Sequence, residues 1–182
     1  MSNKMNPICI GLYGPNGVGK SSIIYKCLFG IFSDKYVPTI EDCYFHHIEG
    51  KYCCITDSSG NLGGIEASVR RKSIEDVHIA ILVHDVTKIE SLEENVLFLN
   101  EINACKNNPL IYLVSNKIDL IDEIEGNDVI EKAQSMARKY NIQTHKLLSA
   151  KDGDGIKTLF NDAIQEILKR HEIKKENCCI IS

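Results

Sequence analysis

A glycine-rich run near the start of the chain has the residue types and spacing of a phosphate-binding loop. Residues 14–21 read Gly-Pro-Asn-Gly-Val-Gly-Lys-Ser and match the pattern G-x-x-x-x-G-K-[ST]. Glycines let successive backbone N–H groups turn toward phosphate oxygens, and a following helix adds the positive end of its dipole. We expect Lys20 to reach the β- and γ-phosphates and the Ser21 hydroxyl to bind Mg²⁺. A glycine-rich turn that matches by chance is the alternative. The candidate phosphate-binding residues are Asn16, Gly17, Val18, Gly19, Lys20, Ser21 and Ser22.

A carboxylate that could hold the same metal follows an apolar run. Residues 52–56 read as a strand, and Asp57 stands at its carboxyl end. An Asp in this position can hold Mg²⁺, usually through water. Alone it would be a strand-end cap, but its pairing with a phosphate loop favours the metal. The N–H of Gly60, three residues later, could face a γ-phosphate.

A second polar motif selects the base. Residues 116–119 read Asn-Lys-Ile-Asp and directly follow a buried-looking run. A carboxylate accepts hydrogen bonds from the N1–H and exocyclic amine of guanine, and such a site rejects adenine because its own polar groups would stay unpaired. We expect Asp119 to read guanine, Asn116 to hold the loop and contact the base, and Lys117 to lay its stem along the ring. The motif by itself is also a common surface-loop string. Ser149, Ala150 and Lys151 form a weaker third signal, with the Ala150 N–H placed for the guanine carbonyl.

The elements that must position these residues are strands alternating with helices. Unbroken apolar runs at 8–13, 79–83 and 110–114 are typical of strands buried on both faces of a parallel sheet. Residues 44–49 and 51–56 read as a hairpin turning at 49–50.

Helical periodicity fills the spaces between the strands. A helix is expected from Lys20 toward Phe29, and apolar stripes follow over 89–102, 129–140 and 156–168. The sequence Gly126-Asn127-Asp128 predicts the start of the third of these four helices. The alternation indicates an α/β domain with helices on both faces of the sheet and ligands at the carboxyl ends of the strands.

Composition excludes several other classes. The 182 residues suffice for one ordinary domain, and a net charge of −4 lacks the basic excess typical of nucleic-acid binding. No apolar run approaches the ~20 residues of a membrane span. A polar start and Ser2 lead us to expect neither secretion nor myristoylation. The spacing of the eight cysteines favours neither a disulfide framework nor a zinc site, and we expect most of the six internal ones to be small core residues.

These motifs together give the chain a resemblance to the Ras superfamily of small GTPases over essentially its whole length. Residues 36–44, Tyr-Val-Pro-Thr-Ile-Glu-Asp-Cys-Tyr, look like the effector loop of the Ras and Rap branch. The resemblance implies a P-loop NTPase fold: a six-stranded, mostly parallel sheet with about five helices. By resemblance, Phe32 lies against guanine, Tyr36 and Pro38 close over the nucleotide, Thr39 binds Mg²⁺ in the GTP state, and Ile40, Glu41 and Asp42 contact effectors. A plain loop is the alternative for the Pro-Thr step.

Three departures from the family pattern bear on hydrolysis, in which Lys20, Gly60 and residue 61 would be catalytic. Asn61 replaces the Gln that orients the attacking water and is one methylene shorter. Ser59 replaces a small apolar residue, and Asn16 stands where most Ras-branch members have Gly. We expect slow turnover and a poor response to an arginine finger. Alternatively, the loop adapts, or an activator supplies its own amide. The basic run at 70–72 is either a solvated helix face or a regulator contact.

The chain ends in Cys178-Cys179-Ile-Ile-Ser, which fits a farnesylation motif at Cys179 with Cys178 available for palmitate. We therefore expect a GTPase domain over 1–171, a flexible tail over 172–182 and attachment to the cytoplasmic face of a membrane.

The predicted function is a GTP/GDP switch with Mg²⁺ that hydrolyses GTP slowly and binds effectors, an exchange factor and a GTPase-activating protein, as a monomer. The alternatives are a nearly hydrolysis-deficient, GTP-bound membrane-tethered scaffold and a P-loop phosphotransferase. For the phosphotransferase, the sequence offers neither an acceptor pocket nor a lid.

Overall fold

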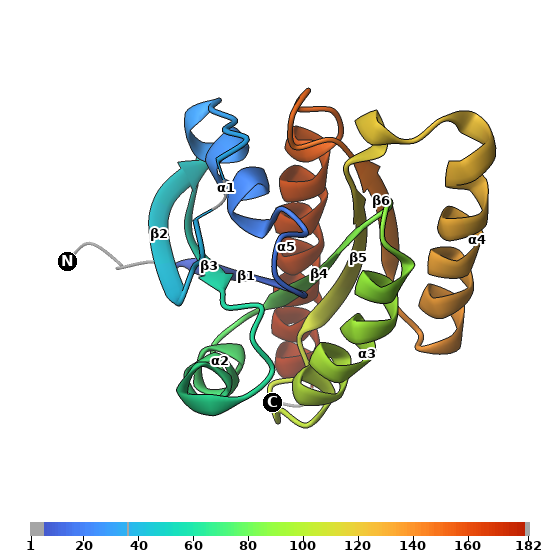
Figure 1. Ribbon diagram of the computed structural model, residues 1–182. Helices are drawn as coiled ribbons and strands as arrows, with labels where there is room; N and C mark the ends of the chain where they lie inside the picture. Colours follow the sequence, from blue (N-terminus) through green and yellow to red (C-terminus); the bar gives the residue numbers. More distant parts are fainter. Residues whose placement is uncertain (1–5, 36, 181–182) are drawn as a thin grey trace.

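The computed structural model describes residues 6–35 and 37–180, and the side chains of these except 123–127 and 171–180. Within them lie six strands and five α-helices around one sheet (Figure 1). The strand order is β2-β3-β1-β4-β5-β6, with β2 antiparallel to β3 and every other pair parallel. The predicted fold class is confirmed. In chain order the elements are β1 Ile8–Tyr13, α1 Lys20–Phe29, β2 Glu41–Ile48, β3 Lys51–Ser58, α2 Gly64–Ile74, β4 Ile79–Asp85, α3 Ile89–Asn103, β5 Leu110–Asn116, the 3-10 turn Ile118–Leu120, α4 Glu123–Lys139, β6 Thr144–Leu148 and α5 Ile156–Ile180.

The helices cover the sheet in two layers. Helices α1 and α5 pack on one face, and α2, α3 and α4 pack on the other (Figure 1). Alternate residues of β4 supply both cores, because Ile79 and Ile81 belong to the α1/α5 cluster and Ala80 and Leu82 to the opposite one. This double burial explains the unbroken apolar runs.

The strands end in polar residues that the apolar runs did not include. Strand β4 continues to Asp85 and β5 to Asn116, and these two residues are register partners. Strand β3 carries Asp57, which is paired with Leu12 of β1 just before the phosphate loop. Three polar side chains therefore lie along one edge of the sheet, where its parallel strands end.

Two expectations from the sequence are wrong in detail. Helix α4 begins at Glu123, so the predicted start at Gly126-Asn127-Asp128 lies inside the helix. Asp122 followed by Glu123 and Glu125 suits the earlier start, since acidic side chains stabilise the first turn. Among the cysteines, Cys53 and Cys54 are buried, but Cys43 is exposed on β2.

Helix α5 extends through most of the segment 172–182 that was expected to form a tail. Its backbone is helical to Ile180, and the side chains of Cys178 and Cys179 lie outside the described ones. Among the helices that the structure describes, none is long and apolar enough to cross a membrane.

Three polar side chains form a hydrogen-bonded row across the α3/α4 side of the sheet. His84 Nε2 on β4 lies 2.6 Å from Ser115 Oγ on β5, which lies 2.7 Å from His145 Nε2 on β6. Burial lowers the pKa of His84 to about 4, and burial also lowers the pKa of His145. Both imidazoles are therefore neutral in the folded protein at pH 7.

Acid is expected to destabilise the chain through His84. The pKa of His84 is lower in the folded than in the unfolded state. Its contribution to the free energy of unfolding is therefore complete above pH 6.5 and is lost as the pH falls toward 4. Between pH 7 and pH 4, the free energy of unfolding of His84→Gln should therefore fall by roughly 3 kcal/mol less than that of the wild type. Urea unfolding at each pH measures the difference. His47→Gln, at an exposed histidine, serves as the control, and an equal pH dependence in both variants would contradict the prediction.

Candidate functional site

The phosphate loop connects β1 to α1 in a conformation that glycine makes possible. Gly14, Gly17 and Gly19 have φ values of 137°, 76° and 99°, in the region that side chains disfavour. A Cβ at Gly14 would collide with the carbonyl oxygen of Val83, and one at Gly19 with the amide nitrogen of Asn116. The loop therefore lies directly against the ends of β4 and β5.

Lys20 is buried at the first position of α1, with its ammonium inside the loop. Its Nζ donates to the carbonyl oxygens of Gly14 at 2.7 Å and Pro15 at 2.9 Å. Burial lowers the pKa of Lys20 to about 8, against the opposing charge of Asp57. A cation in this position fits an anionic ligand, since phosphate oxygens would restore the charge pairing that burial removes.

Three oxygen-bearing side chains from separate elements converge beside the loop. Ser21 Oγ lies 3.1 Å from Thr39 Oγ1, which lies 3.5 Å from Asp57 Oδ2. The other carboxylate oxygen of Asp57 is buried and has no hydrogen-bond partner. Burial raises the pKa of Asp57, although Ser21 and Lys20 oppose the shift. An orphaned buried carboxylate oxygen among hydroxyls fits Mg²⁺, whose preferred ligands are oxygens.

Asn116 joins the two predicted nucleotide motifs. Its Nδ2 donates to the Val18 carbonyl of the phosphate loop at 2.8 Å, and its Oδ1 accepts the Ala150 N–H at 3.1 Å. The side chain is buried, so both bonds are shielded from water. One amide thus fixes the phosphate loop, the end of β5 and the loop after β6 relative to one another.

Lys117 crosses from the base motif to the phosphate loop. Its Nζ donates to the Gly17 carbonyl at 2.8 Å and to Asp85 Oδ2 at 2.6 Å. Burial alone would raise the pKa of Asp85, but hydrogen bonds from Lys117 and Thr87 outweigh it and hold the pKa below its usual value. Asp85 was not among the predicted site residues. Its position two residues past the apolar run 79–83 is the signal that could have identified it.

Asp119 lies at the rim, where Ser149 orients its carboxylate. Ser149 Oγ is 2.7 Å from Asp119 Oδ1 and 3.3 Å from Asp152 Oδ2. The neighbouring Lys151 carbonyl accepts a hydrogen bond from Lys26 of α1 at 3.1 Å. The structure therefore brings the third, weak signal of the sequence together with the base motif.

The loop after β3 packs against the phosphate loop at Gly60. A Cβ there would meet the Pro15 carbonyl carbon at 2.6 Å, so only glycine permits this approach. Asn16 and Asn61, two of the departures from the family pattern, contact each other directly. Asn16 Nδ2 donates to Asn61 Oδ1 at 2.7 Å, and both residues are exposed.

The basic run at 70–72 is not simply a solvated face. Arg70 is fully buried, forms two hydrogen bonds with Glu101 of α3 at 2.8 and 3.1 Å, and lies 4.9 Å from the centre of the Phe98 ring. It also donates to the carbonyls of Ser59 and Asn61. Both predicted interpretations are therefore wrong for Arg70, and its partner 31 positions away explains why the local sequence misled.

The remaining predicted residues differ in their exposure to solvent. Ser22 is half-buried in α1, and Phe32 is half-buried and packs against the α1/α5 core. Pro38, Ile40 and Asp42 are exposed, while Glu41 is half-buried at the start of β2. Tyr36 lies outside the described residues.

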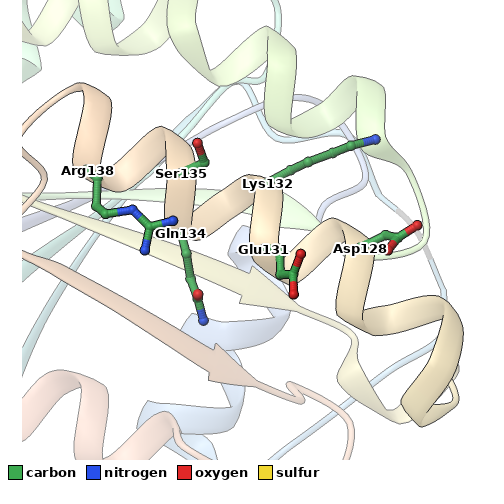
Figure 2. Close-up of a pocket in the computed structure, with 6 residues that line it drawn as sticks. All are labelled: Asp128, Glu131, Lys132, Gln134, Ser135 and Arg138. Atoms are coloured by element: carbon green, nitrogen blue, oxygen red, sulfur yellow. The ribbon is translucent and has the colours of Figure 1, made fainter.

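A separate hollow of about 590 Å³ lies on α4, and none of the predicted site residues that the structure describes lines it. All six lining residues project from this one helix, as Figure 2 shows. Because every lining residue comes from one helix, the hollow lacks the polar groups from several elements that converge at the phosphate-loop site.

Comparison with known proteins agrees with this geometry. The model of the Ras family matches residues 10–169. GTP-binding protein Di-Ras2 of Mus musculus is 32% identical over 171 residues, covering 90% of this chain and 83% of that protein. GTP-binding protein drn-1 of Caenorhabditis elegans is 33% identical, with 88% and 75% covered, and Ras-like protein rasU of Dictyostelium discoideum is 29% identical, with 93% and 79% covered. These similarities do not specify a branch.

Proposed function

Because this chain belongs to the Ras family of small GTPases, we propose that it is a molecular switch that binds GTP or GDP with Mg²⁺ and hydrolyses GTP slowly. The observation that carries the guanine-nucleotide site is the Asn116 amide, which bonds to both Val18 and Ala150. This contact brings a phosphate-binding loop and a guanine-reading carboxylate into one site. The names of the Di-Ras relatives support the same ligand.

Each residue of the proposed phosphate site would have a separate role in hydrolysis. Ser21, Thr39 and Asp57 would hold Mg²⁺, which when bound neutralises charge on the phosphate oxygens. Lys20 supplies a buried positive charge, and the Gly60 N–H would donate to the terminal phosphate. Asn61 would orient the attacking water through its side-chain carbonyl.

The slow rate rests on how Asn61 is held. Its Oδ1, the oxygen that would accept a hydrogen bond from water, already accepts one from Asn16 at 2.7 Å. The side chain is also one methylene shorter than the Gln usual in the family. A misplacement of roughly 1 Å can lower a rate about 100-fold. A side chain at position 16 would also crowd an arginine finger supplied by a GTPase-activating protein.

Releasing this contact is expected to accelerate hydrolysis. Asn61→Gln and Asn16→Gly should each raise the single-turnover rate, and together they should raise it by about 100-fold. Protein loaded with GTP is mixed with excess Mg²⁺, and the GDP formed is quantified over hours.

Asn100→Gln, an exposed amide on α3, is the matched control and should leave the rate unchanged. No increase in either single variant would refute slow hydrolysis caused by Asn16 and Asn61. A wild-type rate at the usual pace of small GTPases would mean that the loop accommodates Asn61. Displacement of bound GDP by adenine nucleotides would contradict the guanine site itself.

The second candidate function is a GTP-bound scaffold that hardly hydrolyses its nucleotide. The Asn16–Asn61 hydrogen bond favours it, because it engages the Asn61 oxygen that would otherwise accept a hydrogen bond from the attacking water. Purified protein that retains GTP over hours in the assay above would support the scaffold over the cycling switch.

The same protein would bind effectors and regulators and would attach to a membrane. The exposed Ile40 and Asp42, with Glu41 between them, form an edge available to effectors. An exchange factor and a GTPase-activating protein would act on the loops around the nucleotide. The C-terminal motif supports farnesylation of Cys179 and palmitoylation of Cys178. Through these lipids the protein, as a monomer, would attach to the cytoplasmic face of a membrane.

A further inference from the structure

Two thiols meet on one face of the β2–β3 hairpin, apart from the nucleotide chemistry. Cys43 Sγ lies 3.2 Å from Cys54 Sγ. Cys43 pairs with Thr56 and Phe45 pairs with Cys54, so the two cysteines are diagonal neighbours across an antiparallel ladder. A disulfide bond is about 2.05 Å long, so the sulfurs would need to approach by roughly 1 Å. Because both cysteines belong to the same pair of strands, we expect a change in their side-chain torsion angles to bring the sulfurs this much closer.

The two thiols differ in access and in protonation. Cys43 is exposed, whereas Cys54 is 8% exposed. Burial, together with the hydrogen bond and charge of Cys43, raises the pKa of Cys54 to about 12. Cys54 therefore keeps its proton and can donate it to Cys43 Sγ. Thr56 Oγ1, 3.4 Å from Cys43 Sγ, offers a second donor. Both groups therefore lie within reach of Cys43 Sγ, the sulfur that solvent can reach.

The neighbouring cysteines are less well placed for the same reaction. Cys9 is the register partner of Cys54 on β1, but it is half-buried and its Sγ donates to the Pro7 carbonyl. Cys53 is buried, and its Sγ donates to the Lys51 carbonyl at 3.4 Å. The pairing that combines an exposed thiol with a close sulfur is Cys43 with Cys54.

We propose that Cys43 and Cys54 are a modification site at which a hydroperoxide forms a reversible disulfide between β2 and β3. The Cys43 thiolate attacks one peroxide oxygen, the O–O bond breaks, and the departing hydroxide takes a proton to give water. Cys43 is then a sulfenic acid.

The second step closes the bond. Cys54 sulfur attacks the Cys43 sulfur, the S–O bond breaks, and the hydroxyl leaves with the Cys54 proton as a second water. Two thiols and one hydrogen peroxide give one disulfide and two waters, and a dithiol reductant reverses the change. Because Cys43 directly follows Asp42, oxidation alters the strand that carries the exposed Asp42 and begins directly after the exposed Ile40.

Peptide mapping of the oxidised full-length chain tests this site. GDP-loaded protein is treated with hydrogen peroxide, free thiols are alkylated, and the chain is digested without reduction for mass spectrometry. We expect a peptide linking Cys43 to Cys54 that dithiothreitol separates, and a loss of two titratable thiols from the eight in the sequence. Cys43→Ser should abolish the link. Cys105→Ser, at a half-buried thiol beyond α3, is the matched control and should retain it.

The same mapping can overturn the inference without any variant. Wild-type protein in which Cys43 proceeds to sulfinic or sulfonic acid while Cys54 remains alkylated would exclude the pair. A link from Cys54 to Cys9 in place of Cys43 would also exclude it. The result does not depend on nucleotide hydrolysis, so the proposed switch and the proposed disulfide can fail independently.

Discussion

Replacement of Asp119 by Asn is expected to change the base preference of the site from guanine to xanthine. The Asp119 carboxylate offers two acceptors for the N1–H and exocyclic amine of guanine. Asn offers one acceptor and one donor, and its amide N–H would oppose the amine. Xanthine has an oxygen in place of that amine, so the amide N–H would find an acceptor. Sites built around such hydrogen bonds discriminate by about 10⁴-fold, and we expect a change in relative affinity of that order.

Competition between GDP and xanthosine diphosphate for a fluorescent nucleotide measures the change. Ser149 Oγ, 2.7 Å from Asp119 Oδ1, should still donate to the carbonyl oxygen of the substituted amide, so the loop should keep its position. Asp152→Asn is the matched control, because Asp152 also contacts Ser149 and the variant loses the same charge. It should retain the preference for guanine. An Asp119→Asn variant that binds GDP as tightly as wild type would show that another group reads the base.

Much of the fold could be predicted because the determining patterns are local. The run from Ile8 to Tyr13 became β1 with the same bounds, since apolar residues that face two cores leave little alternative to a buried strand. The start of α4 was misjudged because Gly126 resembles a helix boundary, whereas the acidic turn before it stabilises an earlier start. A single glycine in a helix costs only about 1 kcal/mol, which tertiary packing can offset.

The candidate site was predictable where a motif is contiguous and unpredictable where it is assembled by the sheet. The loop at 14–21 and the residues 116–119 were found separately in the sequence. The contact of Asn116 with Val18, 98 positions apart, exists only because β1 and β5 flank β4. The Asn16–Asn61 hydrogen bond depends in the same way on the close approach at Gly60. The spacing of residues in the sequence identifies the groups of each motif, whereas the strand order of the sheet determines which of these groups are in contact.

Loss of Arg70 is expected to lower the free energy of unfolding by about 4 kcal/mol, because breaking one partner from a buried ion pair leaves a charge uncompensated. Its guanidinium is fully buried and bridges Glu101 to the carbonyls of Ser59 and Asn61. Arg70→Met keeps an apolar stem against Phe98 but removes every one of these donors. Urea unfolding at fixed excess GDP and Mg²⁺ measures the cost, since bound nucleotide adds the same stabilisation only while its concentration is constant.

Two further variants separate the ion pair from the backbone contacts. Arg71 lies 3.5 Å from the same Glu101 but its side chain is 61% exposed, so Arg71→Met should cost less than about 1 kcal/mol. An equal cost for Arg70→Met would contradict a special role for burial. The double variant Arg70→Met/Glu101→Leu removes both charges and should recover much of the stability. Any stability that the double variant does not recover is attributed to the carbonyls of Ser59 and Asn61, which lose their hydrogen-bond donor. Arg70 therefore connects the packing of α2 on α3 to the position of the loop that would orient water for hydrolysis.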